Sequence, residues 1–189
     1  MNVHVTRALD GFSRRRFTVA EVLRMQDSGI FAPDERFELI EGEIVPVQAK
    51  HHQHERIRLA LNRALSRYLP DHLQLGVETS CYLSEITFVE PDLSVFPISI
   101  PTDQVRAGDL LLAIEVGASS LALDRGPKAK VYASYGLREL WVIDASTGLT
   151  YVHTDPAALG YGSIVEMRPQ EVLATRSLPG FGFRVADVP

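Results

Sequence analysis

The segment DLLLAIEVG at positions 109–117 constrains the fold more than any other part of the sequence. Its apolar residues run almost without a break, which is typical of a central strand that is covered on both faces. We therefore expect a sheet with other elements packed against both of its sides. Glu115 interrupts the run, and a carboxylate in such a strand needs a partner or a polar site.

Length and composition favour one globular domain. The chain has 189 residues, of which 46% are hydrophobic, which is enough for a substantial core and short for two domains. We predict an N-terminal tail at 1–17 and a single domain at 18–189. The sequence has no run of about 18 apolar residues, and its first residues lack the apolar stretch of a signal peptide. We therefore expect a cytoplasmic protein.

The charge of the chain limits how it can meet nucleic acid. A formal net charge of −5 argues against a protein that coats nucleic acid through bulk electrostatics, because such binding neutralises phosphates with Lys and Arg. The net negative charge does not exclude a local basic groove on the surface. The cationic cluster SRRRF at 13–17 is either a solvated tail or a phosphate contact, and the solvated tail is the simpler interpretation.

Cys81 is the one cysteine of the sequence. A single cysteine excludes an internal disulfide and any zinc site that needs several thiolates. We expect Cys81 to be a small, buried or half-buried strand residue rather than a nucleophile.

Three local patterns predict the first elements of the domain. Thr18 and Glu21 have the spacing of a capping box, so a short helix should begin there. The segment 37–47 alternates around a Glu-Gly pair and predicts a hairpin with a two-residue turn. Apolar residues at three- and four-residue intervals predict an amphipathic helix over 51–69. Its apolar stripe consists of Ile57, Leu61, Ala64, Leu65 and Tyr68.

The remainder of the chain predicts strands with one more helix between them. Extended, mostly apolar segments predict strands at 74–83, 86–96 and 110–117. A second helix is expected at 127–135. The segment 139–154 predicts another hairpin, with DASTG as its turn, and further short strands follow toward the C-terminus. These elements together predict an α/β (α+β) fold.

Asp92 and Glu115 stand in neighbouring apolar strand patterns, where an unpartnered charge would cost several kcal/mol. Two carboxylates that project from adjacent strands form a hard oxygen site suited to Mg²⁺ or Mn²⁺. Acids at strand ends are also common as helix caps and salt-bridge partners. The pair alone leaves both interpretations open.

Lys128 has the helical spacing of an inward-facing residue. It lies three, four and seven positions before Val131, Tyr132 and Tyr135, the apolar candidates of its helix, whereas Lys130 should face solvent. A lysine that points at an acid-bearing strand could orient an attacking water or stabilise charge on a phosphate. The alternative is a lysine that extends its charged end past the helix terminus to water.

His54 begins the apolar stripe of the long helix, three residues before Ile57, and could meet the carboxylates. The cluster HHQH at 51–54 has residues that can bind zinc, but its histidines sit within one helical turn and do not readily converge on one ion. Glu38, in the first hairpin, could approach the same site as an additional acid.

The ordered motifs FELIEGEIV, HERIRLAL, EPDLSVF, LLLAIEVGASS, DRGPKAKVYASYGLRELWVID and LPGF resemble the Uma family of restriction-endonuclease-like proteins. The resemblance extends from about Thr18 to the C-terminus. It places the chain in the PD-(D/E)XK nuclease superfamily, which implies a mixed central sheet flanked by helices, with additional β-hairpins here.

The resemblance also implies roles for individual residues. Asp92, after Pro91, corresponds to the PD half of the signature, and Glu115 to its second acid. Gly117 stands where the superfamily has a lysine, and the family's lysine on the following helix falls on Lys128. The catalytic residues implied are thus Asp92, Glu115 and Lys128, with Asp92 and Glu115 as metal ligands.

Two further positions correspond to the family pattern in supporting roles, namely His54 and Glu38. One departure is Ala118-Ser119, where the family usually has Ser-Pro, so the loop after the second acid has its own shape.

The function implied by the resemblance is Mg²⁺- or Mn²⁺-dependent hydrolysis of phosphodiester bonds by an endonuclease, with DNA as the expected partner. The sequence permits a homodimer. Two alternatives stay open: a non-catalytic module that binds nucleic acid or another partner on the nuclease fold, and a metal-dependent hydrolase of other phosphoesters.

Overall fold

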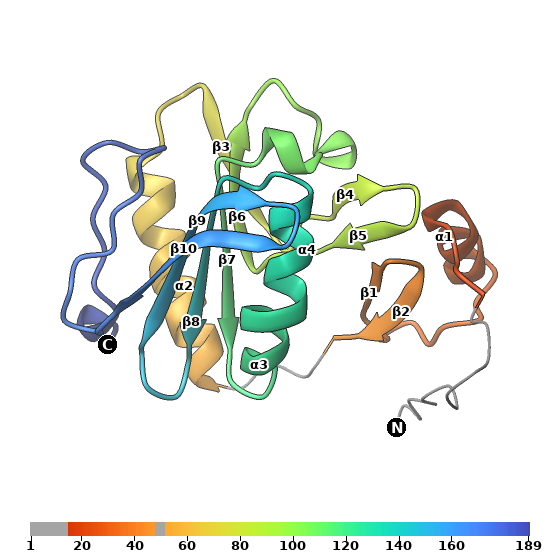
Figure 1. The fold of residues 1–189 in the computed structure, drawn as a ribbon, viewed down its shortest axis with the longest axis horizontal. Coiled ribbons are helices and arrows are strands. Elements are labelled where there is room, and N and C mark those ends of the chain that lie inside the picture. Colours follow the sequence, from red (N-terminus) through yellow and green to blue (C-terminus); the bar gives the residue numbers. More distant parts are fainter. Residues whose placement is uncertain (1–14, 48–51) are drawn as a thin grey trace. The chain divides into compact units, whose positions relative to one another are not determined.

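The computed structural model of the protein describes residues 15–47 and 52–189 (Figure 1). The described residues form two compact units. The smaller unit comprises the residues up to Val47 and Tyr82–Val89, and the larger unit comprises 52–81 and Glu90–Pro189. The prediction of a single domain at 18–189 stays a prediction. Within the described residues, no helix has both the length and the apolar character needed to span a membrane.

The smaller unit begins with α1 (Val19–Asp27), and its N-terminus has the predicted capping box. The Thr18 hydroxyl accepts a hydrogen bond from the backbone N–H of Glu21, and the Glu21 carboxylate accepts one from the backbone N–H of Thr18. The predicted helix start is therefore confirmed.

The predicted first hairpin consists of β1 (Phe37–Ile40) and β2 (Glu43–Pro46). Its two turn residues, Glu41 and Gly42, have φ values of 52° and 79°, the left-handed pair that suits a two-residue hairpin turn. The hairpin extends into a four-stranded sheet in the order β2-β1-β5-β4, with β4 at Cys81–Ser84 and β5 at Thr87–Val89. The buried apolar residues beneath it are Val22, Phe37, Leu39 and Phe88.

The larger unit is built on a six-stranded mixed sheet in the order β10-β9-β8-β7-β6-β3. Its central strands β7 and β8 run parallel, and all other neighbouring strands are antiparallel. Every residue of β7 is buried, as the apolar run at 109–117 predicts. The strands are β3 (Leu73–Val77), β6 (Leu93–Pro97), β7 (Leu112–Gly117), β8 (Glu139–Asp144), β9 (Thr150–Ala157) and β10 (Gly160–Met167).

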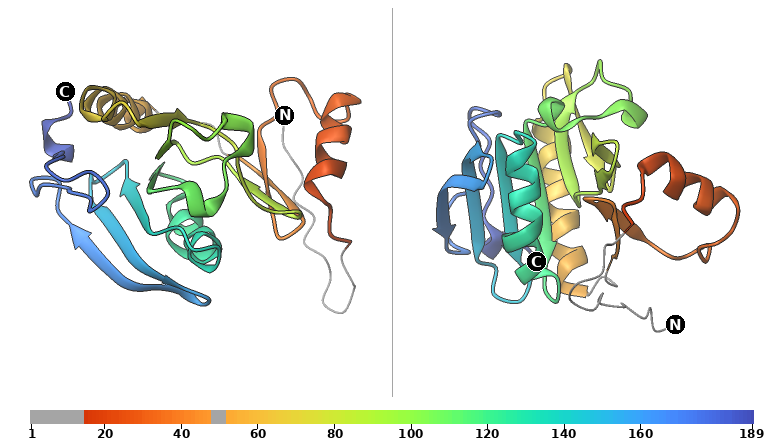
Figure 2. Two further views of the ribbon diagram at one scale, coloured as in Figure 1. Left: turned by 90° about the horizontal axis from the view of Figure 1, so that it is seen from above. Right: turned by 45° about the vertical axis from the view of Figure 1, so that its right-hand side comes forward.

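Helices cover the two faces of the six-stranded sheet (Figures 1 and 2). The long helix α2 (His52–Tyr68) lies on one face. On the other face, α3 (Leu121–Leu123) continues through a π-helical turn (Asp124–Lys128) into α4 (Ala129–Ser134). Short 3-10 helices complete the chain at Thr102–Gln104, Ala107–Asp109 and Val185–Asp187. The predicted arrangement of a mixed sheet between helices is confirmed.

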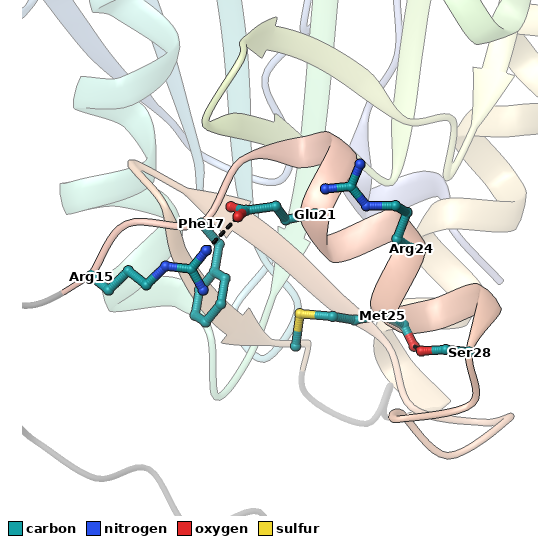
Figure 3. Close-up of a pocket in the computed structure, with 6 residues that line it drawn as sticks. All are labelled: Arg15, Phe17, Glu21, Arg24, Met25 and Ser28. Atoms are coloured by element: carbon teal, nitrogen blue, oxygen red, sulfur yellow. Dashed lines mark hydrogen bonds and ion pairs between the residues drawn. The ribbon is translucent and has the colours of Figure 1, made fainter.

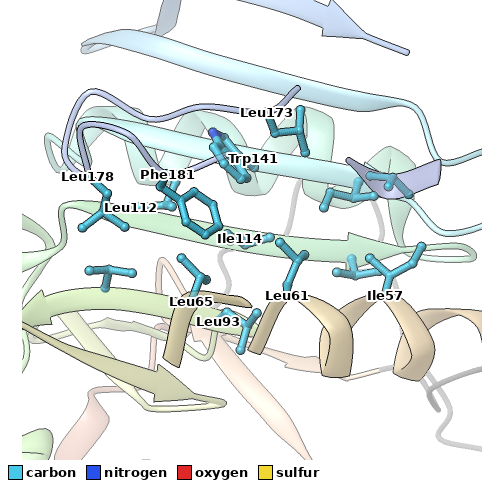
Figure 4. Close-up of a cluster of buried hydrophobic side chains, with 14 of the residues drawn as sticks. Ile57, Leu61, Leu65, Leu93, Leu112, Ile114, Trp141, Leu173, Leu178 and Phe181 are labelled. Atoms are coloured by element: carbon cyan, nitrogen blue, oxygen red, sulfur yellow. The ribbon is translucent and has the colours of Figure 1, made fainter. Parts of the chain in front are cut away.

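The main core lies between α2 and the sheet (Figure 4). Ile57, Leu61 and Leu65 of α2 are buried against strand residues that alternate along β6, β7 and β8. The predicted stripe is wrong at one position, because Tyr68 is 40% exposed and packs by its edge on Phe181 of the C-terminal segment. That segment also contributes Leu173, Leu178 and Phe181 to the core.

Two of the predicted strands are each divided between the two sheets. The segment 74–83 breaks at Glu78, whose φ of 49° is left-handed and ends the extended backbone of β3. The segment 86–96 breaks at Pro91, which has no N–H to give to a strand ladder. The alternation of apolar residues continues across both breaks, so the pattern alone does not reveal them.

The helix predicted at 127–135 begins six residues earlier than expected. Pro127 does not begin the helix but sits inside a continuous helical stretch from Leu121 to Ser134. The wide π turn accommodates a proline that cannot donate a backbone hydrogen bond. Near the C-terminus, the expected strands reduce to β10 and an isolated bridge between Leu173 and Phe183.

Candidate active site

Asp92 and Glu115 lie across from each other at one end of the β6–β7 pair. The antiparallel register pairs Leu93 with Ile114, so one step further along it sets Asp92 opposite Glu115. Both are almost completely buried, with 7% of Asp92 and 4% of Glu115 exposed. Glu115 stands on β7, and Asp92 directly precedes the neighbouring strand β6.

The carboxylate of Asp92 is held by the backbone of β7 and by α2. Its Oδ2 accepts a hydrogen bond of 2.8 Å from the backbone N–H of Val116. The Nε2 of His54 lies 3.0 Å from each of the two carboxylate oxygens. The expected meeting of His54 with the acids is therefore confirmed for Asp92. These bonds offset the cost of burying the acid and fix its orientation.

Glu115 is held from the opposite face of the sheet. Its Oε1 lies 2.9 Å from Nζ of Lys128 and accepts a 2.7 Å hydrogen bond from the hydroxyl of Tyr132. Lys128 is only 5% exposed, whereas Lys130 is exposed, as their helical spacing predicts. Lys128 therefore points at the sheet and does not extend to water.

A chain of polar contacts extends from His54 along α2, and the sequence patterns did not identify it. Nδ1 of His54 is 3.2 Å from Oε1 of Glu55, and Oε2 of Glu55 is 2.6 Å from Arg58. Arg58 is also 3.7 Å from Glu78. The hydrogen bond to Glu55 raises the pKa of Arg58, and the charges of Glu55, Glu78 and Asp92 add to it against the opposing effect of burial.

Glu78 stands on the other side of Asp92, because β3 pairs with β6 and the backbone N–H of Glu78 donates to the Asp92 carbonyl at 3.2 Å. The Glu55-Arg58 spacing of three residues is a helical pair that sequence inspection could have found. No sequence spacing indicates that Glu78 lies near Arg58 and Asp92, since its position depends on how β3 pairs with β6.

Asp124 is a third buried acid beside these residues, with 5% of its surface exposed. A side-chain carbon added at Gly117 would lie 2.7 Å from Oδ2 of Asp124 and 3.0 Å from Oγ of Ser120. Gly117 therefore gives room to this carboxylate. A side chain at 117 would therefore have to displace the Asp124 and Ser120 side chains, and Lys128 approaches Glu115 from the helix.

The acids fit a divalent cation by their chemistry. Asp92 and Glu115 offer hard carboxylate oxygens from neighbouring strands, and Mg²⁺ commonly uses one or two protein carboxylates while it keeps several waters. Across residues 15–47 and 52–189, no cluster of three or more His, Cys, Asp or Glu side chains is arranged to hold a metal ion. A metal here would therefore depend on these two acids and on water or substrate oxygens. Of the histidine cluster, His52 is exposed, His54 is buried, and His51 lies outside the described residues.

Glu38 and the arginine cluster belong to the smaller unit. Glu38 lies on β1, is 4% exposed, and its supporting role stays a prediction. Arg15 pairs with Glu21 and lies over the ring of Phe17 at 5.0 Å, beside a shallow pocket that Arg24, Met25 and Ser28 complete (Figure 3). Arg15 is thus engaged within its own unit, and residues 13 and 14 of the cluster lie outside the described residues.

Cys81 is buried, as expected for a structural strand residue. Burial raises the pKa of its thiol to about 12, so the reactive thiolate is scarce at neutral pH. The prediction that Cys81 is not a nucleophile agrees with this environment.

Comparison with known proteins supports the fold and the family. Residues 19–186 match the Uma2 family, which is described as "Putative restriction endonuclease". No curated protein matches the sequence. The chain is similar to a crystal structure from Anabaena variabilis titled as a "putative nuclease belonging to DUF820". The two are 17% identical, the match covers 91% of this chain and 97% of that one, and the TM-score is 0.71.

The structural similarity confirms the predicted fold, and the family match confirms the resemblance seen in the sequence motifs. Since the matched residues 19–186 include nearly the whole chain, the protein belongs to the Uma2 family of restriction-endonuclease-like proteins.

Proposed function

We propose that the protein is a divalent-metal-dependent endonuclease that hydrolyses phosphodiester bonds, with DNA as the substrate. The observation that carries this proposal is the pair of buried carboxylates, Asp92 at the start of β6 and Glu115 on the neighbouring β7, with Lys128 2.9 Å from Glu115. The nuclease character of the family supports the reaction class.

Asp92 and Glu115 would hold Mg²⁺ or Mn²⁺ through their oxygens. When bound, the ion supplies a Lewis acid and a water of lowered pKa. Lys128, which already lies against Glu115, would position the attacking water and stabilise the charge that builds on the phosphate. His54 would orient the carboxylate of Asp92 through its bond at Nε2. Glu38 is the remaining candidate for a supporting role.

One observation favours a second function, a module that binds nucleic acid without cleaving it. His54 and Lys128 each place a nitrogen within 3.0 Å of a carboxylate oxygen of one of the two acids. The acids are therefore satisfied in the structure without an ion, and a chain that had lost its metal could still bury them.

Cleavage of supercoiled plasmid DNA and of a labelled RNA, in Mg²⁺, in Mn²⁺ and in chelator, tests the proposal. We expect cleavage that the chelator abolishes and that Asp92→Asn and Glu115→Gln each reduce by at least about a hundredfold, on the scale of lost metal-ion catalysis. Cleavage that survives in both variants would refute the assignment. Hydrolysis of a small phosphodiester with none of DNA or RNA would instead support a hydrolase of other substrates.

We also propose that the protein acts in the cytoplasm and that it can pair as a homodimer, since cutting both strands of a duplex often uses two sites. The β9–β10 hairpin carries exposed apolar residues, among them Leu159, Ile164 and Val165. Sedimentation that gives a monomer at micromolar concentration would remove the dimer.

A further inference from the structure

The outer face of α2 carries a row of arginines. Arg56, Arg63 and Arg67 are separated by seven and four residues, which places them within about 40° of one another around the helix. Arg63 follows the buried Leu61 by two residues and so stands about 200° round from it. The row therefore runs along the side of α2 that faces away from the sheet.

This row lines a groove of about 440 Å³ between α2 and the C-terminal segment, which lie side by side (Figures 1 and 2). The arginines supply one wall together with Leu59, and Phe183 and Asp187 contribute to the other. Leu59 is 55% exposed, so the groove combines charge with accessible apolar surface.

The charge in this groove is largely unneutralised. Arg63 and Arg67 are exposed, and within the part of the chain that the structure describes neither has a hydrogen-bond or ion-pair partner. Among the described lining residues Asp187 is the one acidic side chain, and it is 3.8 Å from Arg184. Arg56 donates to Gln53 and to the Pro189 carbonyl.

The concentration of arginine contrasts with the whole chain. Helix α2 has four arginines against one glutamate, whereas the protein has a formal net charge of −5. A local excess of positive charge on an acidic protein favours an anionic partner at this face, because the remaining surface repels one.

The spacing and chemistry fit a phosphodiester backbone. With a rise of about 1.5 Å per residue, the arginines stand about 10 Å and 6 Å apart along the helix axis. A guanidinium binds phosphate through two parallel hydrogen bonds, and apolar or aromatic side chains beside it offer contacts for sugars and bases. Leu59 and Phe183 are placed for such contacts.

Helix α2 also connects this row to the candidate active site. His54, in its first turn, contacts Asp92, and Arg56 follows His54 by two residues on the opposite side of the helix. A nucleic-acid strand that lies along the arginine row and passes the N-terminal end of α2 would thus reach the carboxylates of the candidate active site.

We propose that the outer groove of α2 binds the phosphate backbone of nucleic acid, with Arg63 and Arg67 as its main contacts and Arg56 as a third. The inference rests on the proposed function for the identity of the anion, and it adds a binding surface separate from the cleavage residues.

The test is the affinity of the full-length protein for a labelled DNA duplex and for a single strand, measured by fluorescence anisotropy in chelator over a series of salt concentrations. Arg63→Gln combined with Arg67→Gln should weaken duplex binding at least about tenfold at low salt. The slope of log K against log salt should fall by about 1.8 for the duplex, because each lost phosphate contact contributes about 0.9.

The matched control is Arg138→Gln combined with Arg168→Gln, which removes the same charge at two exposed positions outside the groove. We expect its affinity and salt slope to stay at the wild-type values. Equal losses in both double variants, or none in the groove variant, would overturn the proposal, and so would the absence of DNA binding by the wild type. Circular dichroism of each variant checks that the substitutions leave the fold intact.

Two further outcomes separate this proposal from the proposed function. Binding that depends on Arg63 and Arg67 in a protein that cleaves no polynucleotide would support the groove and refute the nuclease. Polyglutamate that competes as strongly as DNA of equal charge would identify the groove as a site for acidic proteins and overturn the assignment to nucleic acid.

Discussion

Asp92 and Glu115 are two acids held by different kinds of partner. Asp92 is bound by a backbone N–H of β7 and by His54, and Glu115 by Lys128 and Tyr132. Since His54 comes from α2 and Lys128 from the opposite face of the sheet, both helices converge on one pair of carboxylates. The burial of these charges is tolerated only because each has several partners.

Replacement of Lys128 by Met should destabilise the protein by about 3 kcal/mol, because the carboxylate of Glu115 then stays buried without the positive charge of Lys128. If Glu115 is a metal ligand, Mn²⁺ should restore part of the lost stability in the Lys128→Met variant. The ion should raise the denaturation midpoint of the wild type by less than it raises that of the variant. Chemical denaturation with and without Mn²⁺ measures both effects.

Lys130→Met is the control for that substitution, since Lys130 is an exposed lysine of the same helix. Its effect should stay within about 0.5 kcal/mol. Equal stability of the Lys128 and Lys130 variants would mean that the Lys128–Glu115 contact contributes nothing to the fold.

The end of β7 packs directly against the π turn of the following helix. Gly117 closes β7, and Asp124 opens the π turn with its carboxylate directly against that glycine. Lys128 ends the same turn, so the wide turn sets both the acid and the lysine beside the strand. A helix that began at Pro127 would have left Asp124 in a loop.

Gly117→Ala should cost about 1–3 kcal/mol, because the added carbon would stand 2.7 Å from the Asp124 carboxylate and force the packed turn to move. Gly126→Ala is the matched control within the turn itself, where an added carbon meets nothing within 4 Å. It should leave stability unchanged or raise it by up to about 1 kcal/mol. Thermal unfolding of both variants checks the contrast, and a Gly117 variant as stable as the Gly126 variant would contradict the tight fit.

Local patterns in the sequence predict the elements whose cause is local. The capping box at Thr18, the turn at Glu41-Gly42 and the buried strand β7 all follow from adjacent residues, and they are found where expected. The inward direction of Lys128 likewise follows from helical spacing alone.

Local sequence patterns do not predict features that depend on strand register or on unusual backbone conformations. The divisions at Glu78 and Pro91 interrupt strands whose apolar pattern continues, and the π turn tolerates Pro127 inside a helix. The ion pair of Arg58 with Glu78 joins α2 to the residue that follows β3, so its formation depends on tertiary packing.

At the level of the whole molecule, stability should depend on pH through a buried histidine far from the acids in sequence. His153 on β9 is 1% exposed, and its Nδ1 lies 3.0 Å from the Tyr151 carbonyl. Burial lowers the pKa of His153, opposed in part by its hydrogen bonds to the Tyr151 and Leu140 backbone. The folded protein therefore keeps this ring neutral at pH values where the unfolded chain takes up a proton.

The sign of the effect follows from linkage. Below the unfolded value of about 6.5 the unfolded state binds more protons, so stability should fall as the pH drops from about 6.5 toward the folded pKa. Between about pH 7 and pH 5, the His153→Gln variant should lose less of its stability than the wild type loses, with each protein compared with its own stability at pH 7. Denaturation midpoints at both pH values provide the comparison, and identical pH slopes in variant and wild type would contradict the assignment.

The most direct measurement is a calorimetric titration of Mn²⁺ and Mg²⁺ into the wild type and into Asp92→Asn combined with Glu115→Gln, because metal binding can be measured before the substrate is known. We predict binding to the wild type that is lost in the double variant, with circular dichroism showing the same fold in both. Equal binding by the two proteins, or binding by neither, would contradict a metal site at Asp92 and Glu115.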